Sequence, residues 1–372
     1  MKRSRRPIER ISTAQLAILS GAVGLGTVFL PITSIITRLA GADSTLALLA
    51  AGPFIAVLGR LAHAAQFKFP RKSLVAQFEL AFGRIIGRAL ALPLGLALIA
   101  FAAGLERQIA DVYIIALMPK TPPWVFAVAI AGLAGALAYE GVEALARYVT
   151  ITHPLVLAVL VILVAAAAPL FNWHHFLPLF EHGIGPAFKG FARALPFAGE
   201  VVLFVWAILP NVNQPRGGPR AVTVGSIPTI AILIALNAAT IGALSAPETA
   251  RLFYATIDLA KLIQIGDYLR GLEAIIIPVF TAASVTKTAA FLLAGSRIIG
   301  DCFGLPDARP TVAPIALAAT AGTLALTKAT TMVRFIDFLD WYFMLPALFL
   351  PFIVWPLALL RSKRAARRTV GG

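Results

Sequence analysis

The feature of this sequence that most restricts its fold is a succession of apolar runs, each about as long as a bilayer is thick. A helix needs roughly 20 residues to cross the hydrocarbon core, and we count ten such runs. They lie at 13–36, 43–66, 89–118, 122–139, 148–171, 191–212, 219–245, 270–295, 310–328 and 337–360. The runs are continuously apolar rather than alternating, so they predict helices and not the strands of a membrane barrel.

The composition leaves no room for a water-soluble protein. Only 13% of the residues are charged and 59% are hydrophobic, and the mean hydropathy is +0.86. A soluble domain carries about 25% charged residues. Too few polar side chains are left to cover a surface that faces water. The sequence therefore predicts an all-α polytopic membrane protein.

Lysine and arginine residues set the expected orientation. They gather in the tails 1–12 and 361–372 and in the segment 67–88. The alternate loops hold fewer of them: Arg38, Lys120, Lys189 and Arg193. Because positive residues accumulate on the cytoplasmic side, both termini are expected to face the cytoplasm. The net charge of +15 is spread over tails and short loops, so it favours anionic lipid headgroups over nucleic acid as a partner.

The longer segments between the spans carry their own predictions. Segment 67–88 has apolar residues at helical spacing and predicts an amphipathic helix in the cytoplasmic interface. Segment 246–269 is expected to be helical on the outer side. The single cysteine, Cys302, has no partner for an internal disulfide and is expected to be an inert cytoplasmic thiol. The first span begins soon after the basic tail and lacks a small-residue cleavage site, so no removable signal peptide is expected.

Ten spans in a single membrane domain divide into two sets of five, 13–171 and 191–360. An odd number per set makes the sets enter the membrane in opposite directions, which is the requirement for an inverted-repeat transporter. In such folds the binding site lies where corresponding helices are interrupted. The first helices of the two sets carry the glycine- and proline-containing stretches SGAVGLGTVFLP and ALPFAGEVV. Interruptions are therefore expected in spans one and six.

Several stretches resemble known permeases. GLGTVFLP at 24–31 is similar to the glycine-rich first-helix motif of the amino acid–polyamine–organocation permeases. More specifically, the chain resembles the spore-germination permeases, the permease-like B subunits of nutrient germinant receptors. The matching stretches, in order, are ISTAQL, FPRKSLVAQFELAFGRIIGR, LPFAGEVVLF and LAKLIQIGDYLRGLEAIIIPVFTAASVTK. They support a match over about residues 11–360.

The resemblance implies a LeuT-like fold, with a 5+5 inverted repeat and broken helices one and six. It also implies an L-amino acid as ligand at these breaks. The partners would be a larger A subunit and a lipoprotein C subunit, in the inner membrane of a dormant spore. No cofactor is implied. The sequence has no Walker motif, nucleophile elbow or zinc-binding helix, so we expect no enzyme activity.

The expected breaks define the candidate ligand-binding residues. Gly24 and Gly26 would let a ligand approach the backbone, since glycine has no Cβ. The competing interpretation is that they only let helices pack closely, but Gly199 in the matching helix and the resemblance favour ligand contact. The candidates are Gly24, Gly26, Thr27, Phe197, Gly199, Glu200, Thr281 and Ser284.

Two charged residues at membrane depth need an explanation, because such residues usually face a cavity or a partner. Three roles are open for Glu200: contact with the ligand's ammonium group, transfer of a coupled proton, or a structural pair with a buried base. The first two are favoured. Two roles are open for Lys287. It replaces the sodium ion that LeuT-like folds can hold between helices one and eight, or it extends to the cytoplasmic interface.

The other intramembrane charges are expected to be structural. Arg107 and Asp111 are four positions apart and are expected to pair on one face of the third helix. Arg60 needs a partner, for which Glu79 and Glu200 are the candidates. The outer-loop residues His174, His175, Glu181 and His182 are not expected to bind metal, because adjacent histidines diverge.

Two functions stay open from the sequence. One is a sensor that binds a nutrient and signals germination, and the other is a proton-coupled amino acid transporter that uses Lys287 or Glu200. The same two-state helices serve ligand-gated signalling and alternating access. The resemblance favours the sensor.

Overall fold

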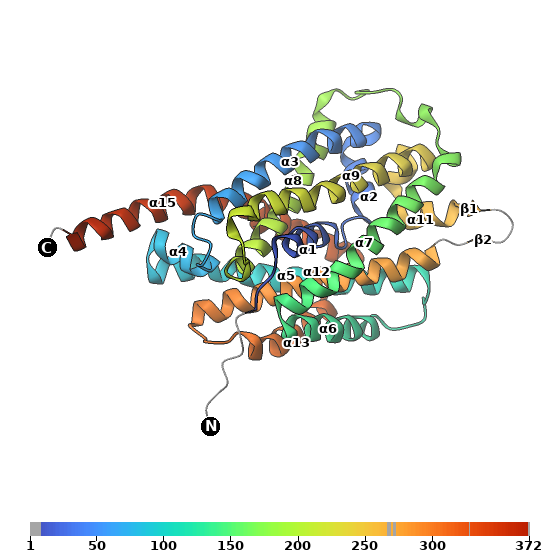
Figure 1. Cartoon of the computed structure of the whole chain (residues 1–372). Helices are drawn as coiled ribbons and strands as arrows, with labels where there is room; N and C mark the ends of the chain where they lie inside the picture. The colour runs from blue at the N-terminus through green and yellow to red at the C-terminus, as the bar shows by residue number, and fades with distance from the viewer. Residues whose placement is uncertain (1–8, 266–268, 271–272, 327, 371–372) are drawn as a thin grey trace.

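The computed structural model describes residues 9–265, 269–270, 273–326 and 328–370 of the 372-residue chain. Nearly all of this part is helical (Figure 1). The helices are α1 (Thr13–Leu25), α2 (Ile32–Ala40), α3 (Ser44–Gln66), α4 (Leu74–Phe82), α5 (Arg84–Ala116), α6 (Pro123–Glu140), α7 (Val142–Ala166), α8 (Ile184–Ile208), α9 (Gly218–Leu244), α10 (Ala246–Arg251), α11 (Ala255–Leu262), α12 (Glu273–Phe303), α13 (Arg309–Ala325), α14 (Ala329–Leu339) and α15 (Leu345–Val370). The strands are β1 (Gln264–Ile265) and β2 (Leu269–Arg270), which pair antiparallel.

The expected membrane fold is confirmed. In the described residues, eight helical stretches are long and apolar enough to cross a membrane. One of them, Ile32–Gln66, contains α2, a short turn and α3. The first and ninth predicted runs fall outside this set, because α1 has 13 residues before its interruption and α13 has 17. The last run is α14 and α15, joined by a π-helical turn at Asp340–Met344.

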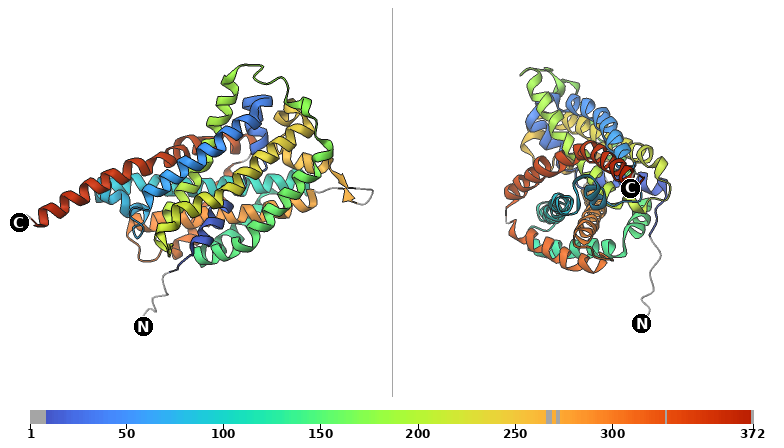
Figure 2. Two further views of the ribbon diagram at one scale, coloured as in Figure 1. Left: turned by 45° about the horizontal axis from the view of Figure 1, so that its top comes forward. Right: turned by 90° about the vertical axis from the view of Figure 1, so that its left-hand side faces the viewer.

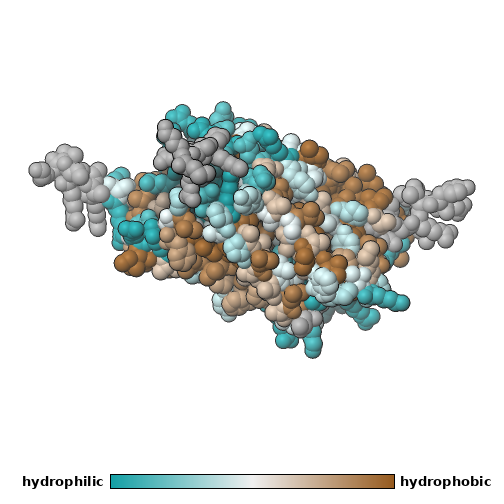
Figure 3. All heavy atoms as spheres, turned by 90° about the horizontal axis from the view of Figure 1, so that it is seen from below, coloured by the Kyte–Doolittle hydropathy of each residue, from teal (hydrophilic) through white to brown (hydrophobic). Residues whose placement is uncertain are grey.

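The bundle has two distinct ends. The N-terminal segment and the end of α15 lie toward one end, which we call the terminal end (Figures 1 and 2). The β1–β2 hairpin lies at the opposite end, which we call the hairpin end. Figure 3 shows apolar side chains over much of one face, with hydrophilic side chains gathered mainly near its margins. This distribution suits a protein surrounded by lipid.

The first predicted interruption is present and has a local cause. Helix α1 begins at a Ser12 capping box and ends at Leu25. Gly26 then takes a φ of +29°, which L side chains rarely adopt, and the chain passes through turns until α2 begins after Pro31. Pro31 has no N–H to continue the helical hydrogen bonds. The sequence GLGTVFLP therefore interrupts helix one as expected.

The second predicted interruption is absent, so that prediction was wrong. Helix α8 runs without a break from Ile184 to Ile208, through Pro196 and Gly199. The missing Cβ of Gly199 serves packing instead, since a Cβ there would overlap the carbonyl oxygen of Met344. Gly199 thus lets α8 approach the π-helical turn between α14 and α15. This is the close-packing role of small residues in membrane helices.

We expect Gly199→Ala to lower the free energy of unfolding by about 1–3 kcal/mol, the usual cost of overpacking. The added methyl group meets backbone, which cannot rotate away as a side chain can. Chemical or thermal unfolding of purified protein measures this loss. Gly185→Ala, in the same helix with open space around it, is the matched control and should cost nothing. Equal effects of the two substitutions would contradict the packing role.

Two predicted interhelical segments differ from the structure. The helix expected over 67–88 is shorter, because Gly83 with φ of +89° ends α4 and α5 begins at Arg84. In 246–269 the helical expectation holds for α10 and α11 but is wrong after Ile263, where the chain becomes extended and forms β1. Residues 266–268 of that expectation lie outside the described residues.

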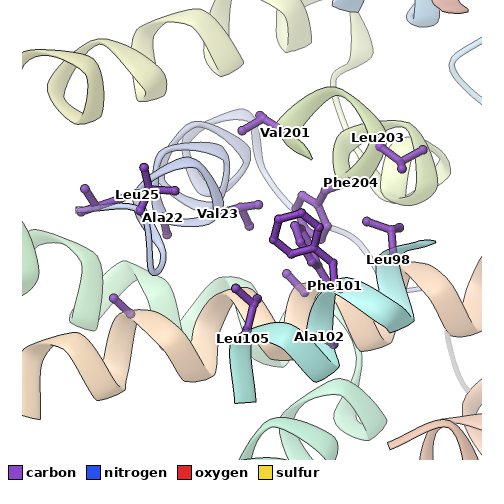
Figure 4. Close-up of a cluster of buried hydrophobic side chains, with 14 of the residues drawn as sticks. Ala22, Val23, Leu25, Leu98, Phe101, Ala102, Leu105, Val201, Leu203 and Phe204 are labelled. Carbon is purple, nitrogen blue, oxygen red and sulfur yellow. The ribbon is translucent and has the colours of Figure 1, made fainter. Parts of the chain in front are cut away.

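The apolar core lies where the interrupted helix meets two continuous ones. Figure 4 shows side chains from three helices converging. They are Ala22, Val23 and Leu25 of α1, Leu98, Phe101, Ala102 and Leu105 of α5, and Val201, Leu203 and Phe204 of α8. This packing holds α1 and its break against α5 and α8, and so fixes the position of the site described next.

Candidate functional site

A cavity with about 500 Å³ of open space lies between the break in helix one and helices α5, α8, α12 and α14. We call it the charged cavity. Its lining is Thr27, Val28, Pro31, Ile35, Phe101, Leu105, Gln108, Arg193, Phe197, Glu200, Phe253, Tyr254, Lys287, Met332, Val333, Ile336, Asp337 and Asp340. Most of the lining is apolar or aromatic, and charged groups of both signs lie within it.

An ion pair lies in this cavity. The Nζ atom of Lys287 is 2.5 Å from Oε2 of Glu200, and the two side chains are 1% and 0% exposed. Lys287 lies near the middle of α12, because that helix continues to Phe303, beyond the end predicted at residue 295. Its ammonium also lies 5.7 Å from the ring centres of Phe101 and Phe291. Lys287 therefore does not extend to the membrane interface.

Gly26 connects this ion pair to the break in helix one. A Cβ on Gly26 would lie 2.9 Å from Cβ and 3.0 Å from Cγ of Lys287, and would overlap its Cδ. The glycine thus makes room for the lysine stem, and the lysine passes directly beside the interruption. The break and the ion pair form one structural unit.

A second ion cluster lies in the same cavity, around Arg193. Its Nη2 atom is 2.6 Å from Oδ1 of Asp337 and 2.9 Å from Oδ2 of Asp340. The guanidinium lies over the Phe197 ring, 5.4 Å from the ring centre. The sequence analysis counted Arg193 among the loop charges, which was wrong, because Arg193 lies inside α8, which begins at Ile184.

The two aspartates were missed by sequence reasoning. Both lie in the stretch FIDFLD at the start of the last predicted span, three positions apart. Two acids within an apolar run are costly in a membrane and mark a functional or paired site. That signal was available, but it does not identify the arginine partner.

The structure brings some of the predicted residues together and separates others. Thr27, Phe197, Glu200 and Lys287 line the charged cavity, and Gly26 contacts Lys287. The remaining candidates, Gly24, Gly199, Thr281 and Ser284, are not among the lining residues. Their surroundings show why.

Gly199 packs against the Met344 carbonyl, and the other three lie outside the charged cavity. Gly24 lines a second, largely apolar cavity between α3, α8 and α9. Thr281 bonds to the Tyr113 hydroxyl at 2.9 Å, nearer the hairpin end. Ser284 is fully buried in α12 outside the charged cavity.

Of the other charges predicted at membrane depth, one pair forms as expected and one arginine does not meet its candidate partners. Arg107 and Asp111 pair along α5 at 2.8 Å, as expected. Arg60 pairs with neither candidate, because Glu79 binds Arg88 at 2.5 Å and Glu200 binds Lys287. Arg60 instead lies exposed on α3, where it lines the second cavity.

The terminal end is closed by a polar junction around Glu9. Its carboxylate pairs with Arg297 of α12 at 3.0 Å and with Arg309 of α13. It also accepts the N–H of Val142, the first residue of α7, at 2.9 Å. Ile11 forms a parallel bridge with Val212 just after α8. The N-terminal segment thus contacts α7, α12, α13 and the end of α8 at the terminal end of the bundle.

We expect Glu9→Gln to loosen this junction, because it removes the charge that pairs with two arginines. Partly buried charge-assisted hydrogen bonds contribute about 1.5–3 kcal/mol each at most, so local opening should increase about tenfold or more. Hydrogen exchange of the Ile11 amide, which donates to Asn211, measures this opening. Glu143→Gln breaks the more exposed pair with Arg147 and should leave the Ile11 amide unchanged. Unchanged exchange in Glu9→Gln would contradict the closing role.

Comparisons with known proteins agree with this architecture. A family model described as "Spore germination protein" matches residues 10–332. No curated protein matches the sequence. The predicted relationship to the spore-germination permeases is therefore confirmed at the level of the family.

Several solved structures share this fold. MhsT in complex with L-phenylalanine matches with a TM-score of 0.68 and 16% identity, over 94% of this chain and 91% of that one. Mhp1, a nucleobase-cation-symport-1 family transporter with bromovinylhydantoin bound, matches with a TM-score of 0.65 and 16% identity, over 91% and 78%. A substrate-bound, Na+-coupled sialic acid symporter matches with a TM-score of 0.61 and 12% identity, over 95% and 89%. These likenesses confirm the LeuT-like fold.

Proposed function

Since the chain belongs to the spore germination protein family, we propose that it is the permease-like membrane subunit of a nutrient germinant receptor. It binds an L-amino acid or a similar small nutrient in the charged cavity, and binding triggers germination. It works with a larger A subunit and a lipoprotein C subunit in the spore inner membrane, with both termini in the cytoplasm. Family and fold neighbours are permeases and transporters rather than enzymes.

The observation that carries this proposal is the charge arrangement of the cavity. Lys287–Glu200 and Arg193–Asp340 put buried groups of both signs beside the interruption in helix one. A free amino acid brings one group of each sign, and the aromatic lining offers contacts for its side chain. The fold relative MhsT was solved with an amino acid, L-phenylalanine. A zwitterionic ligand therefore suits this cavity.

Signalling follows from where the cavity lies. A ligand there would touch the break between α1 and α2 and also α8, α12 and α14. It shifts the protein only if it binds one arrangement of these helices more tightly than the other. The binding energy then favours that arrangement, and the partner subunits would respond to it.

The second candidate is a proton-coupled amino acid transporter. A specific observation favours it: the buried Lys287–Glu200 ion pair lies beside the helix-one break. In that case the lysine ammonium would act in place of a bound sodium ion. Both candidates use the same cavity and differ in whether the ligand crosses the membrane.

One experiment separates them. The purified protein is screened with L-amino acids for thermal stabilisation, and the best ligand is then followed in liposomes with and without an inward proton gradient. Binding without accumulation supports the receptor. Accumulation driven by the gradient makes the protein a transporter. Absence of stabilisation by every L-amino acid would contradict an amino acid as the ligand in both candidates.

A further inference from the structure

We infer that Arg193 binds the carboxylate of the ligand, and that the carboxylate takes the place of Asp337 on this arginine. The inference rests on the proposed function above and adds the ligand's orientation in the cavity. It depends on four observations: a free donor on Arg193, the unequal exposure of its two acids, the continuity of α8, and a free acceptor on Glu200.

Arg193 has an unused hydrogen-bond donor in the cavity. Its side chain is 5% exposed, and its Nη2 atom faces both aspartates. Its Nη1 atom is buried and has no hydrogen-bond partner among the described residues. Leaving a buried donor of a charged group unpaired is unfavourable. A guanidinium binds a carboxylate with two parallel hydrogen bonds, so a ligand carboxylate would satisfy Nη1 while it takes over Nη2.

The two acids beside Arg193 are not equivalent. Asp340 is fully buried, whereas the side chain of Asp337 is 42% exposed. Breaking a fully buried pair leaves an uncompensated charge, which is costly. Breaking a partly exposed pair costs less, and the ligand carboxylate that replaces Asp337 keeps Arg193 paired. Asp337 is therefore the acid that a ligand can displace, and Asp340 stays as the permanent counter-ion.

A helix N-terminus can also bind a carboxylate. Helix α8 is continuous, so it has no N-terminus inside the cavity. At the start of α2, Ile35 lines the cavity and its N–H already donates to Pro31, whereas residues 32–34 are not among the lining residues. The guanidinium of Arg193 is the strongest free donor that lines the cavity in the described chain. The Phe197 ring lies against it.

The other end of a zwitterion has a matching acceptor. Oε1 of Glu200 is buried without a hydrogen-bond partner among the described residues, while Oε2 pairs with Lys287. Arg193 and Glu200 are seven positions apart on α8, about two turns, so both lie on one face about 10 Å apart along the axis. The ligand would then lie between them, with its carboxylate toward the hairpin end and its ammonium toward Glu200.

The test compares amino acids with their carboxamides, which keep the ammonium and the side chain but lose the negative charge. We would screen the twenty common L-amino acids, beginning with L-phenylalanine, and the carboxamide of each, by thermal stabilisation and calorimetry. The wild-type protein should bind its best amino acid about tenfold to a hundredfold more tightly than the amide, the range for a charge-assisted hydrogen bond.

Two variants test the residues themselves. Asp337→Asn removes the competing acid. This variant should bind the amino acid about two- to fivefold more tightly than the wild-type protein does, and its affinity for the amide should be unchanged. A merely structural role of Asp337 would not give tighter binding. Arg193→Gln combined with Asp340→Asn, which leaves no lone buried charge, should lose the preference for acid over amide. Arg193→Lys should retain part of it.

The outcomes separate this inference from the proposed function. If the wild-type protein binds an amino acid and its amide equally, the carboxylate role of Arg193 is overturned and the nutrient site stands. If Asp337→Asn weakens binding of the amino acid, the displacement of Asp337 is overturned. If no amino acid binds at all, the proposed function fails and the inference fails with it.

Discussion

Lys287→Met should lower the free energy of unfolding by about 3–5 kcal/mol, because it leaves the Glu200 carboxylate buried without its counter-ion. The pair is 2.5 Å apart and almost fully shielded from solvent, so water cannot replace the ammonium. Thermal unfolding of purified protein measures the loss. Lys261→Met, which removes an ammonium from a pair that is 41% and 32% exposed, is the control and should cost about 1 kcal/mol or less.

The double variant Lys287→Met/Glu200→Leu separates stability from function. Replacing both members of a buried pair by apolar residues of similar size is often neutral or stabilising. We therefore expect the double variant to recover most of the stability that the single variant loses. It should nevertheless fail to bind the amino acid that stabilises the wild-type protein. If it binds normally, the pair is structural only, and the charged cavity is not the ligand site.

Gly26→Ala is expected to destabilise the protein by about 2–6 kcal/mol, the sum of backbone strain and overpacking. The φ of +29° is unfavourable for any residue with a Cβ, and the new methyl group meets the stem of Lys287. Moving that stem would displace the ammonium from Glu200, so ligand binding should be lost together with stability. Unfolding and ligand-induced stabilisation measure the two effects.

Gly24→Ala is the matched control for this substitution. It lies two positions earlier, within α1, where a Cβ would meet only Val201 at 3.3 Å and Thr229 at 3.8 Å. Its cost should be below about 1 kcal/mol, since alanine also favours the helix. Equal losses of unfolding free energy in the two variants would mean that the glycines at positions 24 and 26 only allow helices to pack closely. Retained ligand binding in Gly26→Ala would contradict the link between the break and the ion pair.

The sequence by itself determined the membrane class, the places of most spans and the interruption of helix one. These features are local: an apolar run of sufficient length has to be a helix in lipid. Gly26 and Pro31 interrupt α1 through their own backbone restrictions. The ordered stretches between ISTAQL and ASVTK were enough to identify the family, which the match over residues 10–332 confirms.

Only the tertiary structure decided which charges meet and which glycine bends the chain. Glu200 and Lys287 are 87 positions apart, and Arg193 and Asp340 are 147 apart, so no local pattern could pair them. Gly199 looked like a helix break, but its use depends on the Met344 carbonyl packed against it. A glycine permits both an interruption and a close contact. The neighbouring helix chooses between them, because burial and ion pairing depend on what the fold brings together.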